Sequence, residues 1–95
     1  MQYMKATLIY RKTETLVNGV KLEMVIWQLP AASLDRPHGI KYRLWAGYAG
    51  NTLVRYDNEA GKGDHKHVGA TEMSYLWQGL EKLVADFIAD VEALK

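Results

Sequence analysis

The chain contains no cysteine, which excludes disulfide bonds, thiolate metal sites and a thiol nucleophile. It also lacks any apolar run near the ~18 residues that a membrane-spanning helix requires. No apolar stretch follows a basic segment at the start, so the sequence predicts no signal peptide. Proline is scarce, and Pro30 and Pro37 both fall in one irregular stretch. These absences together favour a soluble cytoplasmic protein.

The composition is that of one ordered domain spanning residues 1–95, with 48% hydrophobic and 11% aromatic residues. The net charge is only +1, but it is unevenly divided along the chain. Residues 36–68 hold six Lys/Arg against three Asp/Glu, together with all three histidines, whereas residues 69–95 hold two against five. The basic middle indicates a surface that faces a polyanion, although ordinary solvated charge would give the same counts.

Patterns of side chains predict an α+β fold. Runs rich in β-formers predict antiparallel strands at residues 4–13, 20–29, 40–48 and 52–57, and a short fifth strand at 65–68. Asn18-Gly19 and Gly50-Asn51 are the turn signals. Apolar residues then recur every three or four positions and predict an amphipathic helix over about 79–95, with Glu81 completing a capping box. We therefore expect a four- to five-stranded β-meander over residues 4–69, packed by one C-terminal helix.

One helix covers one face of such a sheet, so the other face is left for solvent, a ligand or a second copy in a homodimer. In the strand at 40–48, apolar residues alternate with Lys41, Arg43 and Trp45, which places cations on the open face. We expect Trp27, Trp45 and Trp77 in the core or on a partner surface.

The stretch from Arg55 to Gly69 carries most of the unusual chemistry. His65 and His67 lie one residue apart, so in an extended strand they share a face. Two such histidines can supply the general acid and the general base that RNA cleavage by 2′-hydroxyl attack requires. The expected catalytic residues are His65, His67, Lys62, Asp64 and Asp57, and the expected substrate-binding residues are Arg43, Lys41, Arg55, Lys66 and Tyr56.

Less specific readings of the same residues stay open. One histidine could simply hydrogen-bond a turn, and Asp57 could be a turn former. Asp57 and Asp64 could also join the histidines around zinc, manganese or iron, but the spacing matches no strong metal motif and the neighbouring lysines oppose a cation. Gly61-Lys62-Gly63 lacks the spacing of a nucleotide P-loop. We therefore expect neither a metal nor a cofactor.

The sequence resembles the TumE family of toxins from toxin–antitoxin modules. The resemblance covers nearly the whole chain and is carried by these segments: Glu23–Trp27, Lys41–Leu44, Tyr56–Glu59, Gly61–His65, His67, Gly69 and Leu83–Val91. One departure is Gln78, where a serine cap is expected before the helix. The resemblance implies a growth-arresting toxin that cleaves RNA and a cognate antitoxin with a helix-turn-helix domain.

The residues and the resemblance lead to one functional prediction: a type II toxin that cleaves mRNA or tRNA without a metal. Two alternatives from other classes remain. The chain could be a non-catalytic module that binds nucleic acid or protein through its basic face. It could also be a transferase that uses a nucleotide to modify tRNA or a protein.

Overall fold

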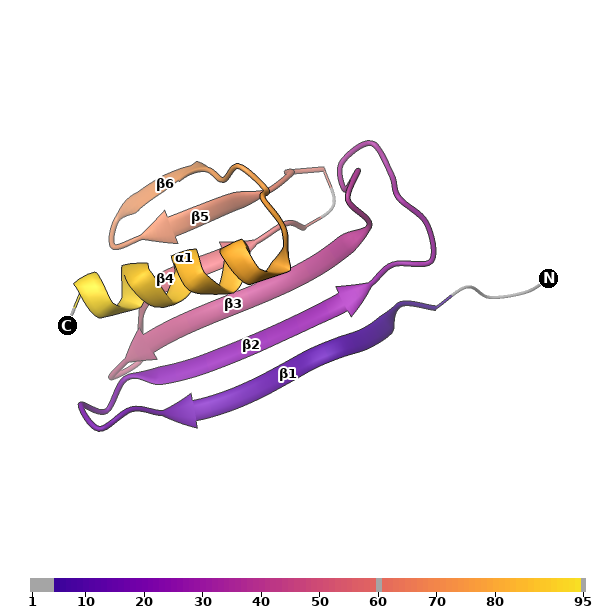
Figure 1. The fold of residues 1–95 in the computed structure, drawn as a ribbon. Helices are drawn as coiled ribbons and strands as arrows, with labels where there is room; N and C mark the ends of the chain where they lie inside the picture. The colour runs from indigo at the N-terminus through magenta and orange to yellow at the C-terminus, as the bar shows by residue number, and fades with distance from the viewer. Residues whose placement is uncertain (1–4, 60, 95) are drawn as a thin grey trace.

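The computed structural model describes residues 5–59 and 61–94, which form a six-stranded antiparallel sheet with one helix across one face (Figure 1). The strands follow one another in sequence order, so each one pairs with its neighbours along the chain. The elements are β1 (Thr7–Thr15), β2 (Lys21–Gln28), β3 (Ile40–Tyr48), β4 (Asn51–Asp57), β5 (His65–Val68), β6 (Thr71–Ser74) and α1 (Leu80–Ala93).

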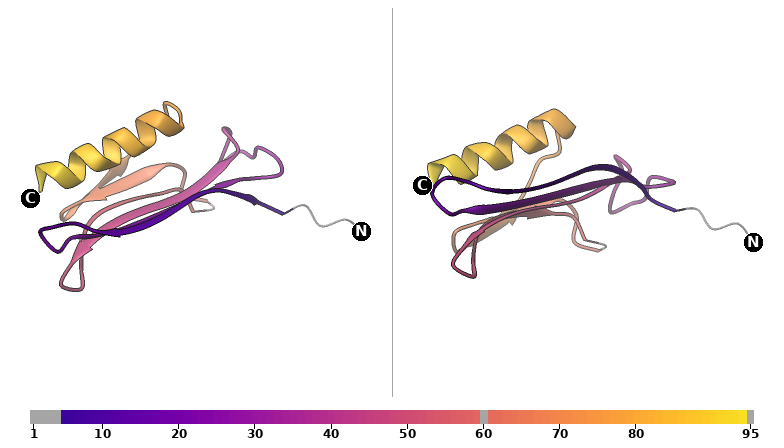
Figure 2. Two further views of the ribbon diagram at one scale, coloured as in Figure 1. Left: turned by 60° about the horizontal axis from the view of Figure 1, so that its bottom comes forward. Right: turned by 90° about the horizontal axis from the view of Figure 1, so that it is seen from below.

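The core lies between α1 and the face of the sheet that it covers (Figure 2). Alternate residues of the central strands point to this face and are almost fully buried against Leu83, Phe87 and Val91 of the helix. The strand residues that contribute are Leu22, Met24, Ile26, Ile40, Tyr42, Leu44, Ala46, Val54 and Tyr56. The helix therefore closes one face and leaves the other open, as the single amphipathic segment predicts.

The register aligns the open-face residues in two rows that cross the strands. One row runs Arg11, Val25, Arg43, Asp57, His65, Ser74 from β1 to β6. The adjacent row runs Thr13, Glu23, Trp45, Arg55, His67, Glu72. Because facing residues of paired strands lie about 5 Å apart, charged groups far apart in sequence become neighbours along each row.

The α+β class, the meander and the C-terminal helix are confirmed, but the expected number of strands was too low. The missed strand is β6, which has four residues, all of them exposed, and so shows no buried alternation. A two-residue turn with Gly69 at a φ of 60° joins it to β5, and the sheet therefore ends at Ser74 rather than at residue 69. The ends of the predicted sheet and helix, Met4 and Lys95, lie outside the described residues.

Two local predictions also need correction. The turn between β3 and β4 is made by Ala49 and Gly50, both with positive φ, and Asn51 is already the first residue of β4. Gly79 is the N-cap of α1 and no side chain hydrogen-bonds to this end, so the predicted capping box does not form. Glycine at the N-cap explains this, because it offers no side-chain acceptor. No helix in the described part of the chain is long and apolar enough to cross a membrane.

Candidate functional site

Asp57 and His65 form the centre of the open-face cluster. They face each other across β4 and β5, and Nε2 of His65 lies 2.6 Å from Oδ1 of Asp57. Both side chains are about nine-tenths buried, with 8% of each exposed. Burying a carboxylate is costly unless a cation compensates its charge, and the guanidinium of Arg55, 3.0 Å from Oδ2 of Asp57, supplies that charge here.

Arg55 connects this pair to His67. Its Nε lies 3.0 Å from Oδ2 of Asp57, and one terminal nitrogen lies 2.8 Å from Nε2 of His67. Nε2 of His67 also lies 3.7 Å from a carboxylate oxygen of the exposed Glu72. These four side chains therefore contact one another in the order His65, Asp57, Arg55, His67. The centroids of the two imidazole rings are 5.7 Å apart.

The hydrogen-bond partners indicate where the protons of the two imidazoles lie. Nδ1 of His65 is 3.0 Å from the carbonyl oxygen of Gly63, which can only accept, so Nδ1 carries a proton. Its Nε2 lies 2.6 Å from a carboxylate oxygen of Asp57, which can only accept when ionised. A guanidinium can only donate, so Nε2 of His67 accepts from Arg55 and the proton of a neutral ring lies on Nδ1. The two histidines thus meet opposite partners: acceptors around His65 and a donor at His67.

A polar hollow of about 350 Å³ opens beside these four side chains and is lined by five of the ten expected site residues, but not by His67. Its walls are Arg43, Arg55, Asp57, Glu59, Lys62 and His65. Oδ1 of Asp57 and Nε of Arg55 make no aligned hydrogen bond among the described residues, although each lies within ion-pair distance of a partner. The walls of the hollow therefore carry three cationic side chains, Arg43, Arg55 and Lys62, together with the carboxylates of Asp57 and Glu59.

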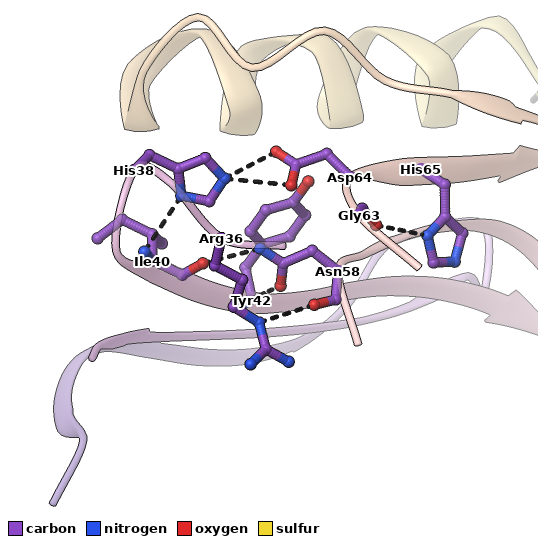
Figure 3. A network of polar contacts seen from close by, with 8 residues as sticks. All are labelled: Arg36, His38, Ile40, Tyr42, Asn58, Gly63, Asp64 and His65. Carbon is purple, nitrogen blue, oxygen red and sulfur yellow. Dashed lines mark hydrogen bonds and ion pairs between the residues drawn. The ribbon is translucent and has the colours of Figure 1, made fainter. Parts of the chain in front are cut away.

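Asp64 lies elsewhere: it binds His38 and not a histidine of the open face (Figure 3). We refer to residues 58, 59 and 61–64 as the glycine loop. Nε2 of His38 is 2.9 Å from the carboxylate, and Nδ1 accepts the amide N–H of Ile40. The ring also stacks on Trp77, with centroids 4.0 Å apart. Asp64 therefore orients a histidine, but one that the sequence analysis did not select, and it does not contact His65 or His67 through any hydrogen bond of the described residues.

Three contacts hold the glycine loop against residues 29–39 and so fix its place beside the hollow. Asp35 accepts the amide N–H of Gly61 at 2.7 Å. The Arg36 Nε donates to the carbonyl of Asn58 at 2.9 Å (Figure 3). The His38–Asp64 pair is the third. The hydrogen bond from Gly61 lowers the pKa of the exposed Asp35 carboxyl. These residues position Lys62, and nothing in the local sequence pattern marks them for this role.

Tyr56 and Lys66, both expected to bind substrate, point to the helix side of the sheet. Tyr56 has no exposed surface and its hydroxyl donates to Asp90 of α1, so it is not available to stack on a base. Burial and the hydrogen bond to Asp90 raise its pKa far above the usual tyrosine value. Nζ of Lys66 lies 3.0 Å from the same carboxylate. Alternation explains both placements, since Tyr56 and Lys66 pair with each other and are each flanked by residues of the open face, Arg55 and Asp57 in β4 and His65 and His67 in β5.

One group of side chains on the open face has the composition of a metal site. Ligand atoms of His65, His67 and Glu72 lie within 4.8 Å of one another. However, the guanidinium of Arg55 is 2.8 Å from His67 Nε2, and Asp64, expected as a possible ligand, is turned away toward His38. A fixed positive charge in hydrogen-bond contact with one of three ligands opposes a cation at this position.

These features define the class: a small α+β domain with a helix on one face of its sheet and a cationic, histidine-bearing hollow on the other. A family model described as Toxin TumE matches residues 3–95, and the chain therefore belongs to this toxin family. No curated protein and no solved structure matches the chain. Membership in the family supports a toxin role and an antitoxin partner.

Proposed function

We propose that this toxin is a metal-independent endoribonuclease whose cleavage site is the hollow beside His65. The observation that carries the proposal is the series of contacts from His65 through Asp57 and Arg55 to His67. His65 and Arg55 line the hollow together with the cations Arg43 and Lys62, and His67 lies next to it, 2.8 Å from Arg55. Cleavage by 2′-hydroxyl attack requires this set: a base, an acid, and positive charge on the phosphate.

His67 is the base in this mechanism. Its Nε2 lone pair is held by Arg55, and a phosphate bound in the hollow competes for that guanidinium. As Arg55 turns to the phosphate, Nε2 becomes free to accept the proton of the attacking 2′-hydroxyl. The oxygen then attacks phosphorus, and a 2′,3′-cyclic phosphate forms as the bond to the 5′-oxygen breaks.

His65 is the acid, and Asp57 orients it. The ring is fixed through Nδ1 by the Gly63 carbonyl, and Nε2 faces Asp57 at the edge of the hollow. A proton from this imidazole neutralises the departing 5′-oxygen. Arg43, Arg55 and Lys62 stabilise the charge that develops on the phosphate, and Lys41 on the same face of β3 contacts the neighbouring backbone.

Single replacements of the two histidines test this mechanism. In His67→Ala and His65→Ala, cleavage of a labelled single-stranded RNA should fall at least about 100-fold, the range for loss of a general acid or base. Asn51→Ala is the control, because this exposed residue at the start of β4 lies outside the hollow. Thermal melts verify that each variant is folded. Cleavage that survives in the folded double variant would reject the mechanism.

The same assay separates the other candidate functions. Cleavage that is lost with a chelator and restored by zinc or manganese would show a metal held by His65, His67 and Glu72. RNA binding that weakens with salt, without any cleavage product, would favour a non-catalytic binding module. A mass increase on tRNA or on a protein that requires added nucleotide would identify a transferase.

The proposed partners are RNA and a cognate antitoxin that carries a helix-turn-helix domain. A homodimer through the uncovered sheet face would cover the hollow, because the candidate site lies on that face. Sedimentation of the purified chain, alone and with a single-stranded RNA, measures both associations. Co-expression with the neighbouring open reading frame, followed by purification, tests whether that frame encodes the antitoxin.

A further inference from the structure

A second hollow on the open face adjoins the one beside His65. It has a volume of about 540 Å³ and is lined by Val25, Trp27, Arg36, Lys41, Tyr42, Arg43, Asp57 and Glu59. Arg43, Asp57 and Glu59 also line the histidine hollow, so the two spaces share a wall. A ligand that is long enough to pass over Arg43 can therefore occupy both hollows at once.

The two hollows differ in what their walls can bind. The walls of the histidine hollow are all ionisable side chains, and three of them, Arg43, Arg55 and Lys62, are cations that can bind an anion. The second hollow combines the indole of Trp27 and the apolar Val25 with three cations, Arg36, Lys41 and Arg43. A flat aromatic surface bordered by positive charge matches a nucleotide, in which a planar base is linked to a phosphate.

The ring of Trp27 is placed to receive a base. It is half-buried on the open face, and Nζ of Lys41 lies 5.4 Å from the ring centroid. A cation–π contact at such a site is weaker than the stacking of a base on an indole, so an incoming base can displace the ammonium toward its own phosphate. The indole nitrogen of Trp45 instead bonds Thr52, and its ring covers Gly47, outside both hollows.

We propose that this second hollow, which we name the Trp27 subsite, binds an unpaired base of single-stranded RNA while Arg43 holds the adjoining phosphate. This inference rests on the proposed function, because it assigns the substrate class of the same site. A base inside a duplex is stacked on its neighbours and cannot lie on the indole. The toxin should therefore discriminate against double-stranded RNA.

Binding of a fluorescent 2′-O-methyl RNA decamer tests the subsite, because this probe lacks the attacking hydroxyl and is not cleaved. Trp27→Leu should weaken binding about tenfold by fluorescence anisotropy, the typical effect of losing one stacking platform. Trp45→Leu, on the same sheet face, should stay within about twofold of wild type. The decamer annealed to its complement should bind much more weakly than the single strand.

A second measurement covers the case in which Trp27→Leu does not fold. The double variant Trp45→Phe, Trp77→Phe leaves Trp27 as the single tryptophan, since the chain has three. Saturation with the decamer should then quench its fluorescence. An unchanged emission, or equal affinity for single-stranded and duplex RNA, would overturn the subsite.

The outcomes for the subsite and for cleavage are distinguishable. If Trp27→Leu binds RNA with unchanged affinity and cleaves it normally, the subsite is rejected and the ribonuclease proposal stands. Binding that depends on Trp27, without cleavage of ordinary RNA by the wild type, would reject the ribonuclease and leave the subsite standing.

Discussion

The side chain of Asn58, just beyond the end of β4, hydrogen-bonds to the backbone of β3 as a paired strand would. Its Oδ1 accepts the amide N–H of Tyr42 at 3.0 Å, and its Nδ2 donates to the carbonyl of Ile40 at 2.7 Å. The side chain has no exposed surface. It therefore satisfies two backbone groups of β3 at the point where the chain leaves the sheet to form the glycine loop.

We expect Asn58→Ala to lower the free energy of unfolding by about 2–4 kcal/mol, because it leaves two buried backbone groups without partners. Urea denaturation measures this loss. The exposed Asn51 provides the control, and Asn51→Ala should change the stability by no more than about 0.5 kcal/mol. A loss below about 1 kcal/mol in Asn58→Ala would mean that water replaces both hydrogen bonds.

The tyrosines beneath the helix predict how stability depends on alkaline pH. Burial and the carboxylates of Asp90 and Asp86 raise the pKa of Tyr56 and of Tyr75, respectively, above the usual value. In the unfolded chain these phenols ionise near pH 10. Their contribution to the free energy of unfolding is therefore fully present below about pH 10 and declines above it. Melting temperatures between pH 8 and 11 should show this decline.

Tyr56→Phe should make that decline shallower, because phenylalanine has no proton to lose. Tyr48→Phe is the matched control, since Tyr48 is 52% exposed and the substitution should leave the slope unchanged. Equal slopes in wild type and Tyr56→Phe would contradict the assignment.

At the scale of the elements, the turn that joins β3 to β4 has a strained backbone residue. Ala49 has a φ of 50°, in the left-handed region where a side chain with a Cβ is disfavoured. Gly50, with a φ of 82°, completes a two-residue turn of the kind that favours asparagine followed by glycine.

Ala49→Asn should therefore raise the free energy of unfolding by about 0.5–1 kcal/mol. Ala70→Asn, in the two-residue turn between β5 and β6, is the control; Ala70 has no positive φ, so its effect should be near zero. Chemical denaturation of both variants measures the difference. Destabilisation by Ala49→Asn would show that the turn is not strained.

The sequence predicted a strand well where apolar residues that become buried alternate with polar residues that stay exposed. Ile40, Tyr42 and Leu44 alternate with Lys41 and Arg43, and this pattern fixed both the strand and its open face. β6 has no buried residue, so its pairing with β5 depends on a turn and on backbone hydrogen bonds that carry no hydrophobic pattern.

The candidate site was predicted in part for the same reason. Period-two alternation put His65 and His67 together, and the same rule, applied to Tyr56 and Lys66, would have placed them under the helix. The role of Asp64 could not be read in this way. Its partner, His38, lies 26 residues earlier in an irregular loop, and such pairings depend on tertiary structure.

At the scale of the whole molecule, stability depends on one thin core. Phe87 has no exposed surface and its ring meets Tyr56 edge-on, with centroids 5.6 Å apart. A domain with one helix on one sheet face has few residues of this kind, and typical domains are stable by only about 5–15 kcal/mol.

Phe87→Ala should cost about 3–5 kcal/mol, the usual range for deletion of a buried phenylalanine side chain, and should largely unfold the domain at 37 °C. The neighbouring Ile88 is only half-buried, so Ile88→Ala should cost clearly less. Circular dichroism melts compare the two. Equal losses would indicate that the helix packs less tightly than its burial implies.

The order of the strands has a consequence for synthesis on the ribosome. Every strand pairs with the one made just before it, so hairpins can assemble while translation continues. The apolar underside of these hairpins stays uncovered until Val91, the last buried residue of the helix, has emerged from the exit tunnel. A message cut near its 3′ end would therefore yield a nascent polypeptide with exposed hydrophobic surface, a substrate for proteases rather than a working toxin.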